Sequence, residues 1–163
     1  MLSESARLST AAELRFRVQA PNSEPRVTAV IALDPPGERF VRGLSEDRWN
    51  RATFLKAPGD DPSGEGGCLT TFDGRRTRIA DEVHSADQVI MVATAGGHAY
   101  ATEAIGRACS LERVTTTALI IGASDASDDE ISRTLAQLRP WSLMVVIAST
   151  DDYVADMMTA LRV

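Results

Sequence analysis

The C-terminal half of the chain alternates short apolar segments with amphipathic ones, and this pattern constrains the fold more than any other feature. Three apolar segments rich in β-branched residues predict strands over 88–93, 116–122 and 142–148. Each is followed by a segment with apolar residues at helical spacing, which predicts helices over 98–110, 128–138 and 151–162. Strands that alternate with helices in this way form βαβ crossovers and a parallel sheet. The sequence therefore predicts a three-layer, Rossmann-like α/β domain with a mostly parallel sheet.

The N-terminal half carries weaker signals of the same kind. They predict a strand over 26–33, a helix over 34–44, a strand over 51–57 and a helix over 79–85. Asp73-Gly74 predicts a hairpin turn or a strand end before the last of these helices. Leu14–Ala20 alternates apolar and polar residues strictly, which predicts a half-buried strand that can pair antiparallel at an edge of the sheet.

The chain length fits a single domain over residues 1–163. Residues 1–12 are polar and predict a flexible tail. Residues 58–67 consist only of Pro, Gly, Asp, Ser and Glu, which is typical of a flexible, solvated loop; a lid over a ligand is the alternative.

Composition and charge exclude several classes of function. The formal charge of −6 gives no electrostatic footprint for nucleic acid or for an anionic membrane. No apolar run approaches the roughly 18–20 residues that span a bilayer. The N-terminus has no apolar signal core, so we expect a cytoplasmic protein. Cys68 and Cys109 stand alone, and no zinc site is predicted.

The best candidate for a binding site is the glycine loop after the 88–93 segment, Thr94-Ala95-Gly96-Gly97-His98. Two glycines before a helix can leave backbone N–H groups free for an anion, and the helix dipole favours negative charge there. Asp34 ends a neighbouring predicted strand, so we place it in the same site. A tight turn that only connects strand and helix is the alternative.

His98 and the acidic residues near the predicted strand ends are the other groups that could carry chemistry. His98 could donate to a phosphate or act as a general base, or it could be a polar residue in the first turn of a helix. The aspartates could bind magnesium, but helix capping explains most of them better: Ser127 and Glu130 fit a capping box. We therefore predict no metal site and assign no catalytic residue or cofactor.

The segment 85–122, "SADQVIMVATAGGHAYATEAIGRACSLERVTTTALIIG", resembles the region around the glycine-rich loop of the tubulin-like GTPases. In that family an apolar strand leads into a glycine-rich phosphate loop, then a helix and another strand. The resemblance implies phosphate contacts at Ala95, Gly96 and Gly97, and less directly at Thr94 and His98. The family loop is GGGTGTG, whereas this chain has GGHAYAT, so the resemblance does not extend to GTP hydrolysis or polymerisation.

Two hypotheses follow from the sequence. The first is a domain that binds a nucleotide or a phosphorylated metabolite at the glycine loop. The second is a non-catalytic interaction domain, such as a homo-oligomer, in which the glycine loop is an empty turn. An exposed edge at Leu14–Ala20, or the helix that carries Met157 and Met158, could then make the contact.

Overall fold

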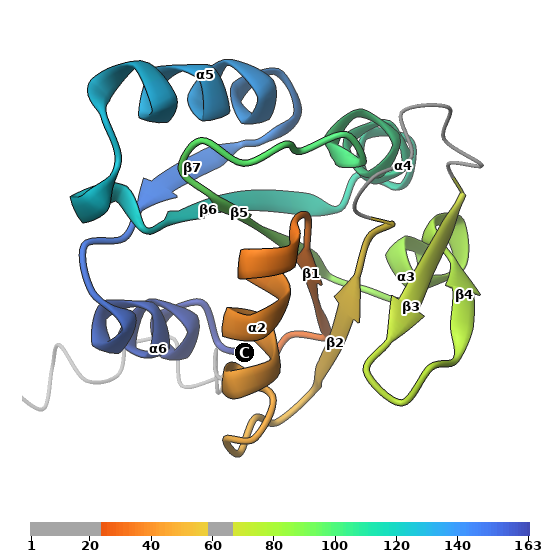
Figure 1. Ribbon diagram of the computed structural model, residues 1–163. Coiled ribbons are helices and arrows are strands. Elements are labelled where there is room, and N and C mark those ends of the chain that lie inside the picture. Colours follow the sequence, from red (N-terminus) through yellow and green to blue (C-terminus); the bar gives the residue numbers. More distant parts are fainter. Residues whose placement is uncertain (1–23, 59–66) are drawn as a thin grey trace, which may run out of the picture.

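The computed structural model describes residues 24–58 and 67–163 (Figure 1). The strands are β1 (Thr28–Ala32), β2 (Ala52–Lys56), β3 (Cys68–Thr71), β4 (Arg76–Arg78), β5 (Gln88–Thr94), β6 (Thr115–Ile121) and β7 (Met144–Ile147). The helices are α2 (Pro35–Leu44), α3 (Ile79–His84), α4 (Thr102–Glu112), α5 (Asp128–Leu138) and α6 (Asp151–Ala160), with short 3-10 turns η2 (Ala123–Asp125) and η3 (Arg139–Trp141). The predicted α/β alternation is confirmed.

The described strands form one seven-stranded sheet in the order β4-β3-β2-β1-β5-β6-β7. The run from β2 to β7 is parallel throughout. β3 pairs antiparallel with β2, and β4 pairs antiparallel with β3. The mostly parallel sheet is therefore confirmed, and its antiparallel part comes from the β3–β4 hairpin. The strand predicted over Leu14–Ala20 lies outside the described residues.

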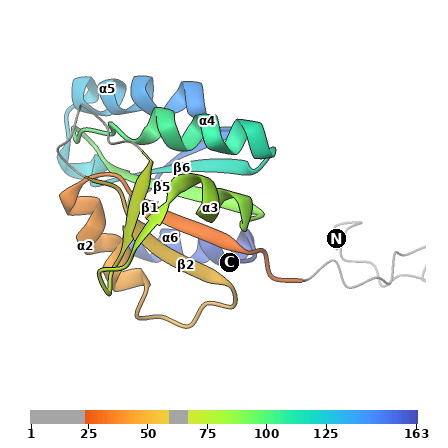
Figure 2. The ribbon, with the colours of Figure 1, turned by 90° about the vertical axis from the view of Figure 1, so that its right-hand side faces the viewer.

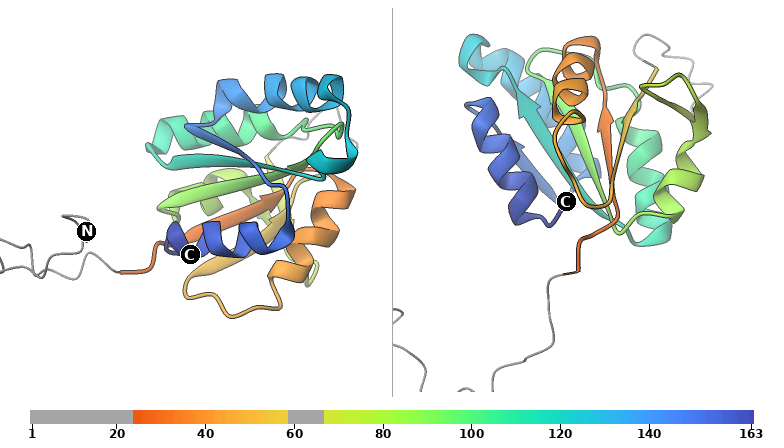
Figure 3. Two further views of the ribbon diagram at one scale, coloured as in Figure 1. Left: turned by 90° about the vertical axis from the view of Figure 1, so that its left-hand side faces the viewer. Right: turned by 90° about the horizontal axis from the view of Figure 1, so that it is seen from below.

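Helices cover both faces of the sheet and make the three layers (Figures 2 and 3). α2 and α6 pack on one face, and α3, α4 and α5 pack on the other. The central strands β1, β5 and β6 are buried almost along their whole length, as expected for a parallel sheet with two covered faces. The alternate side chains of each of these strands supply the two separate cores.

Local signals fix where the helices begin. Asp34 caps α2, and Pro35 and Pro36 occupy its first positions. The predicted capping box of α5 is present, with the Ser127 side chain accepting from the Glu130 amide and the Glu130 side chain accepting from the Ser127 amide. Thr150 stands at the cap of α6 without a side-chain hydrogen bond. The capping interpretation therefore holds for α2 and α5.

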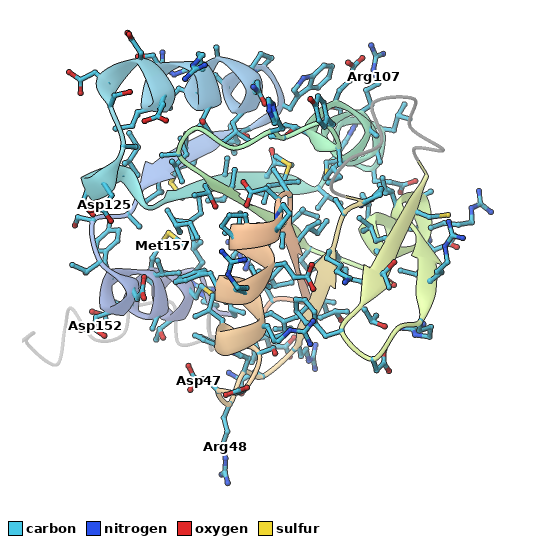
Figure 4. All side chains as sticks on the ribbon, in the orientation of Figure 1. Asp47, Arg48, Arg107, Asp125, Asp152 and Met157 are labelled. Carbon is cyan, nitrogen blue, oxygen red and sulfur yellow. The ribbon has the colours of Figure 1, made fainter. Side chains whose placement is uncertain are left out.

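The face of α6 that carries Met157 and Met158 is not exposed to solvent. Both methionines are buried in the core between α6 and the sheet, where Figure 4 shows Met157 pointing inward. These two methionines are therefore not available for an oligomer contact, because the same apolar stripe is needed to hold α6 on the sheet.

No helix in residues 24–58 and 67–163 is long and apolar enough to cross a membrane.

Candidate functional site

The crossovers on either side of β1 and β5 run in opposite directions. β1 leads through α2 to β2, whereas β5 leads through α4 to β6, although β1 and β5 are neighbours in the sheet. The loops that leave their carboxyl ends therefore diverge, with α2 on one face and α4 on the other. Ligands of open α/β sheets bind at such a switch point, where neighbouring strands connect in opposite directions. Both loops of the predicted site begin here.

Asp34 joins the two loops. Its side chain is buried, with Oδ1 accepting from the Gly37 amide at 2.7 Å and from the Thr94 hydroxyl at 2.9 Å, and Oδ2 accepting from the Thr94 amide at 2.7 Å. The sequence predicted the cap of α2 but not the bonds to Thr94, sixty residues further along the chain. The structure thus brings Asp34 and the glycine loop together through a direct contact.

Gly97 packs tightly against this carboxylate. A Cβ atom at Gly97 would lie 2.3 Å from Asp34 Oδ2 and 3.0 Å from the Thr94 carbonyl oxygen. Gly96 has a φ of +82°, a left-handed conformation that favours glycine. The two glycines therefore serve the local fold of the loop: one allows the turn and the other allows the buried carboxylate to approach.

Most N–H groups of the predicted phosphate loop donate within the protein. The Ala95 amide donates to the Ile121 carbonyl, and the Gly97 amide donates to the Thr94 carbonyl. Together with the Thr94 amide, which donates to Asp34, these bonds hold the first half of the loop against the ends of β1 and β6. This half of the loop is therefore held in place at the switch point by its own backbone hydrogen bonds.

Helix α5 supplies two further acceptors, which the sequence analysis missed. The Gly96 amide donates to Thr134 Oγ1 at 2.9 Å, and the Ala99 amide donates to Gln137 Oε1 at 3.0 Å. Thr134 is fully buried and also donates to the Glu130 carbonyl. Thr134 and Gln137 lie three residues apart on the helix, which puts them on one face, but nothing local in the sequence shows that this face meets the glycine loop.

The start of α4 differs from the start of α2 and α5, because it lacks a cap. α4 begins at Thr102 instead of near His98, and its N-cap residue is Ala101, whose methyl group cannot accept a hydrogen bond. Within the part of the chain that the structure describes, the amides of His98, Tyr100 and Ala101 have no acceptor. Thr102 is 2% exposed, and its Oγ1 also has no partner among these residues. Unpaired donors thus gather immediately before and inside the first turn of α4.

His98 lies in the loop and not in the first turn of a helix. Its side chain is exposed, and its ring stacks on the ring of Tyr100 with centroids 5.2 Å apart and an interplanar angle of 7°. Tyr100 is 50% exposed. The two rings form a small aromatic surface beside the uncapped end of α4, and neither ring is needed to fill the core.

α4 itself is held from its other side by Trp141. The Trp141 side chain covers Gly106, where a Cβ atom would lie 2.5 Å from Trp141 Cβ, and Arg107 stacks over the indole ring at 5.4 Å. Gly106 therefore permits close packing, although against η3 and not against the sheet. This packing fixes the helix whose first turn carries the unpaired donors.

The aspartates at the strand ends do not assemble into a metal site among the described residues, where no group of three or more His, Cys, Asp or Glu side chains is placed to hold a metal ion. Asp125 and Asp152 project from separate elements, as Figure 4 shows. Glu130 is engaged in the capping box, and its hydrogen bonds from Ser127 lower the pKa of its carboxyl group.

A cavity of about 240 Å³ lies beside the switch point, between the start of α2 and the end of β2. Lys56 and Arg42 both bind Glu38 at 3.0 Å, and Lys56 is the chief cause of the lowered pKa of Glu38. Pro35 and Pro36 have no N–H groups, and the Gly37 amide already donates to Asp34. This end of the crevice therefore offers paired charges but few backbone donors.

The two cysteines differ in environment. Cys109 is 1% exposed on α4, and burial raises the pKa of its thiol to about 11. Cys68 is partly exposed on β3. We predict that an aromatic disulfide reagent at neutral pH labels Cys68 in the native protein and Cys109 only after denaturation. Cys68→Ser should abolish the native-state reaction, and labelling of two thiols without denaturant would contradict the assignment.

Fold and candidate site together define an α/β domain whose glycine loop lies at the switch point of a mostly parallel sheet. In the comparison with solved structures, the chain is similar to translation elongation factor SelB from Methanococcus maripaludis in complex with the GTP analogue GppNHp, with 13% sequence identity and a TM-score of 0.50. The match covers 85% of this chain and 33% of that factor, so the chain spans about a third of its length. The apo form of the same factor matches at 8% identity and a TM-score of 0.42, over 82% of this chain and 33% of that one.

No protein-family profile and no curated protein sequence matches the chain. At this level of identity, the likeness to SelB concerns the fold alone. It agrees with the α/β fold that the resemblance drawn from residues 85–122 implies, and it does not single out the tubulin-like GTPases.

Proposed function

We propose that this domain binds a nucleotide or another phosphate-containing small molecule at the start of α4. The observation that carries the proposal is the uncapped end of this helix, where the amides of His98, Tyr100 and Ala101 and the hydroxyl of Thr102 have no partner among the described residues. A phosphate group supplies the several acceptor oxygens that such donors lack.

Electrostatics supports this position over the first half of the loop. The Asp34 carboxylate lies directly beneath Gly97 and would repel an anion bound to the amides of Thr94–Gly97. Those amides also already donate within the protein. In this proposal the base of the site consists of Thr94, Ala95, Gly96, Gly97 and Asp34. The contacts with the ligand begin at His98.

The exposed pair of His98 and Tyr100 suits a ligand with a flat ring. Aromatic side chains provide stacking surfaces for bases, and these two rings stand beside the N-terminus that would hold the phosphate. The GTP analogue in the SelB structure supports a nucleotide over a simple phosphorylated metabolite. We assign no catalytic role to His98. Both cysteines are free thiols, which fits a reducing compartment, and we propose that the protein acts in the cytoplasm.

Calorimetric titration with GTP, GDP, ATP and inorganic phosphate tests the proposal. We expect Ala101→Asp to weaken nucleotide binding by at least about tenfold, or about 1.4 kcal/mol, because its carboxylate would repel a phosphate at the start of α4. The negative charge also favours the helix N-terminus, so the melting temperature should not fall. Ala101→Asn is the matched control, since it has the same shape without the charge.

Two outcomes would contradict the proposal. One is the absence of binding by any of these ligands up to about 1 mM, an affinity that corresponds to about −4 kcal/mol. The other is equal affinity of the wild type and Ala101→Asp, which would place the ligand elsewhere. Gly97 is unsuitable as a test position, because a side chain there would disturb the fold.

A further inference from the structure

The β3–β4 hairpin extends the sheet beyond the helices on one of its faces. On the face that carries α3, the hairpin buries Leu69 in the core. On the opposite face, which carries α2, no described helix lies over β3 and β4 (Figure 1). The side chains that the hairpin directs to this second face are therefore exposed or partly exposed.

The strand register places three cations on this open face. Residues opposite each other in neighbouring antiparallel strands point to the same face of the sheet. The pairs that matter are Lys56 with Thr70, Thr70 with Arg76, and Cys68 with Arg78. Leu69 lies between Cys68 and Thr70 and points into the core under α3, so its two neighbours and their partners point the other way. We call Lys56, Arg76 and Arg78 the basic row.

The basic row carries more positive charge than its surroundings neutralise. Within residues 24–58 and 67–163, Arg76 and Arg78 make no ion pair. Lys56 binds Glu38 Oε1 at 3.0 Å, but Arg42 binds the same oxygen. Two arginines on one face of a short strand repel each other, and carboxylates from outside would relieve this repulsion. The row is thus a positive surface on a chain with a formal charge of −6.

We propose that the basic row binds an acidic segment of a partner protein, which crosses β2, β3 and β4 in an extended conformation. Guanidinium groups bind carboxylates through paired hydrogen bonds. Lys56 and Arg76 lie two strands apart, so their backbones are about 10 Å from each other, whereas alternate side chains of an extended segment are about 7 Å apart. Carboxylates at alternating positions of one segment can therefore reach both ends of the row, and a single small anion cannot.

The charge of the chain favours a short acidic segment over a nucleic acid or an anionic membrane. Both of these are extended polyanions that would also meet the net negative remainder of the protein. The cavity of about 240 Å³ beside the start of α2 borders the basic row, since Lys56 and Thr70 line it. A side chain of a peptide can enter this cavity. The surface is separate from the start of α4, so the proposal does not rest on ligand binding there.

Fluorescence anisotropy with the full chain tests the proposal. The probe is a rhodamine-labelled peptide of alternating Glu and Ser, and a peptide of alternating Gln and Ser is its control. We expect only the Glu peptide to bind, more weakly as salt rises. Arg76→Gln combined with Arg78→Gln should weaken binding at least about fivefold, because two exposed ion pairs are lost. The matched control combines Arg48→Gln with Arg139→Gln, at exposed arginines outside the row, and should change affinity less than about twofold. Figure 4 shows Arg48 pointing away from the sheet.

Cys68 reports where the peptide binds, because it lies opposite Arg78 in the register and is partly exposed. We expect saturating Glu peptide to slow labelling of Cys68 by a neutral maleimide at least about threefold. An unchanged rate at Cys68 would overturn the proposal, as would no binding up to about 1 mM or an equal loss in the control variant. Tighter binding of a single-stranded RNA of the same length would overturn it in favour of a nucleic acid. Self-association of the wild type that the loss of Arg76 and Arg78 abolishes would overturn it in favour of a second copy.

Discussion

Asp34→Ala is expected to lower the free energy of unfolding by about 3 kcal/mol. Loss of an N-cap side chain costs about 0.5–2 kcal/mol, and a hydrogen bond to a charged group contributes about 1.5–3 kcal/mol. Asp34 makes both kinds of contact, to Gly37 and to Thr94, and it is buried. Alanine would leave the Thr94 amide and the Gly37 amide without acceptors. In a protein of this size, the loss corresponds to a fall in melting temperature of about 6–12 °C.

Asp34→Asn separates the charge of this side chain from its shape. Asparagine keeps one acceptor oxygen, but its NH2 group would face a backbone N–H of either Gly37 or Thr94. We therefore expect a loss between zero and that of Asp34→Ala. Asp87→Ala is a suitable control, because Asp87 accepts one exposed bond, from the Val27 amide at 2.9 Å. A loss below about 1 kcal/mol for Asp34→Ala would show that Asp34 does not hold the two loops together.

The sequence predicted the fold because the fold depends on local patterns. Apolar segments of strand length alternate with helical stripes, and Ser127 and Asp34 mark helix starts by the chemistry of their own side chains. Strand order could not be predicted in this way, because it depends on which strands meet after the chain has crossed over. The start of α4 was predicted four residues too early, since Gly96 and Gly97 form a longer loop than a simple turn requires.

The sequence predicted that Asp34 and the glycine loop lie together, but it did not predict their contacts. Asp34 and Thr94 meet because each follows one of two neighbouring parallel strands. The engagement of the loop amides by Thr134 and Gln137 depends on how α5 packs, and these residues lie 38 positions away in the chain. A sequence read alone cannot tell free amides from engaged ones, because the acceptor is set by tertiary structure.

Among glycine-to-alanine substitutions in the glycine loop, we expect Gly97→Ala to lower the free energy of unfolding the most. The new Cβ would lie 2.3 Å from Asp34 Oδ2, and this oxygen cannot retreat without releasing the Thr94 amide. Overpacking of a close-packed site costs about 1–3 kcal/mol, and we expect the upper part of this range. Gly43→Ala is the matched control: nothing lies within 4 Å of its Cβ, and it is inside α2. That change should raise stability by up to about 1 kcal/mol.

Combining Gly97→Ala with Asp34→Ala tests the physical cause of this effect by a double-mutant cycle in chemical denaturation. Once the carboxylate is gone, the nearest atom to the Cβ of residue 97 is the Thr94 carbonyl oxygen, at 3.0 Å. We therefore expect Gly97→Ala to cost less than about 1 kcal/mol in that background, with a coupling energy of about 1–2 kcal/mol between the two positions. Additive losses would mean that the Asp34 carboxylate is not the cause and that other contacts of residue 97, such as the one with the Thr94 carbonyl oxygen, determine the loss. Strong coupling would instead show that residue 97 is a glycine because the buried Asp34 carboxylate lies against it.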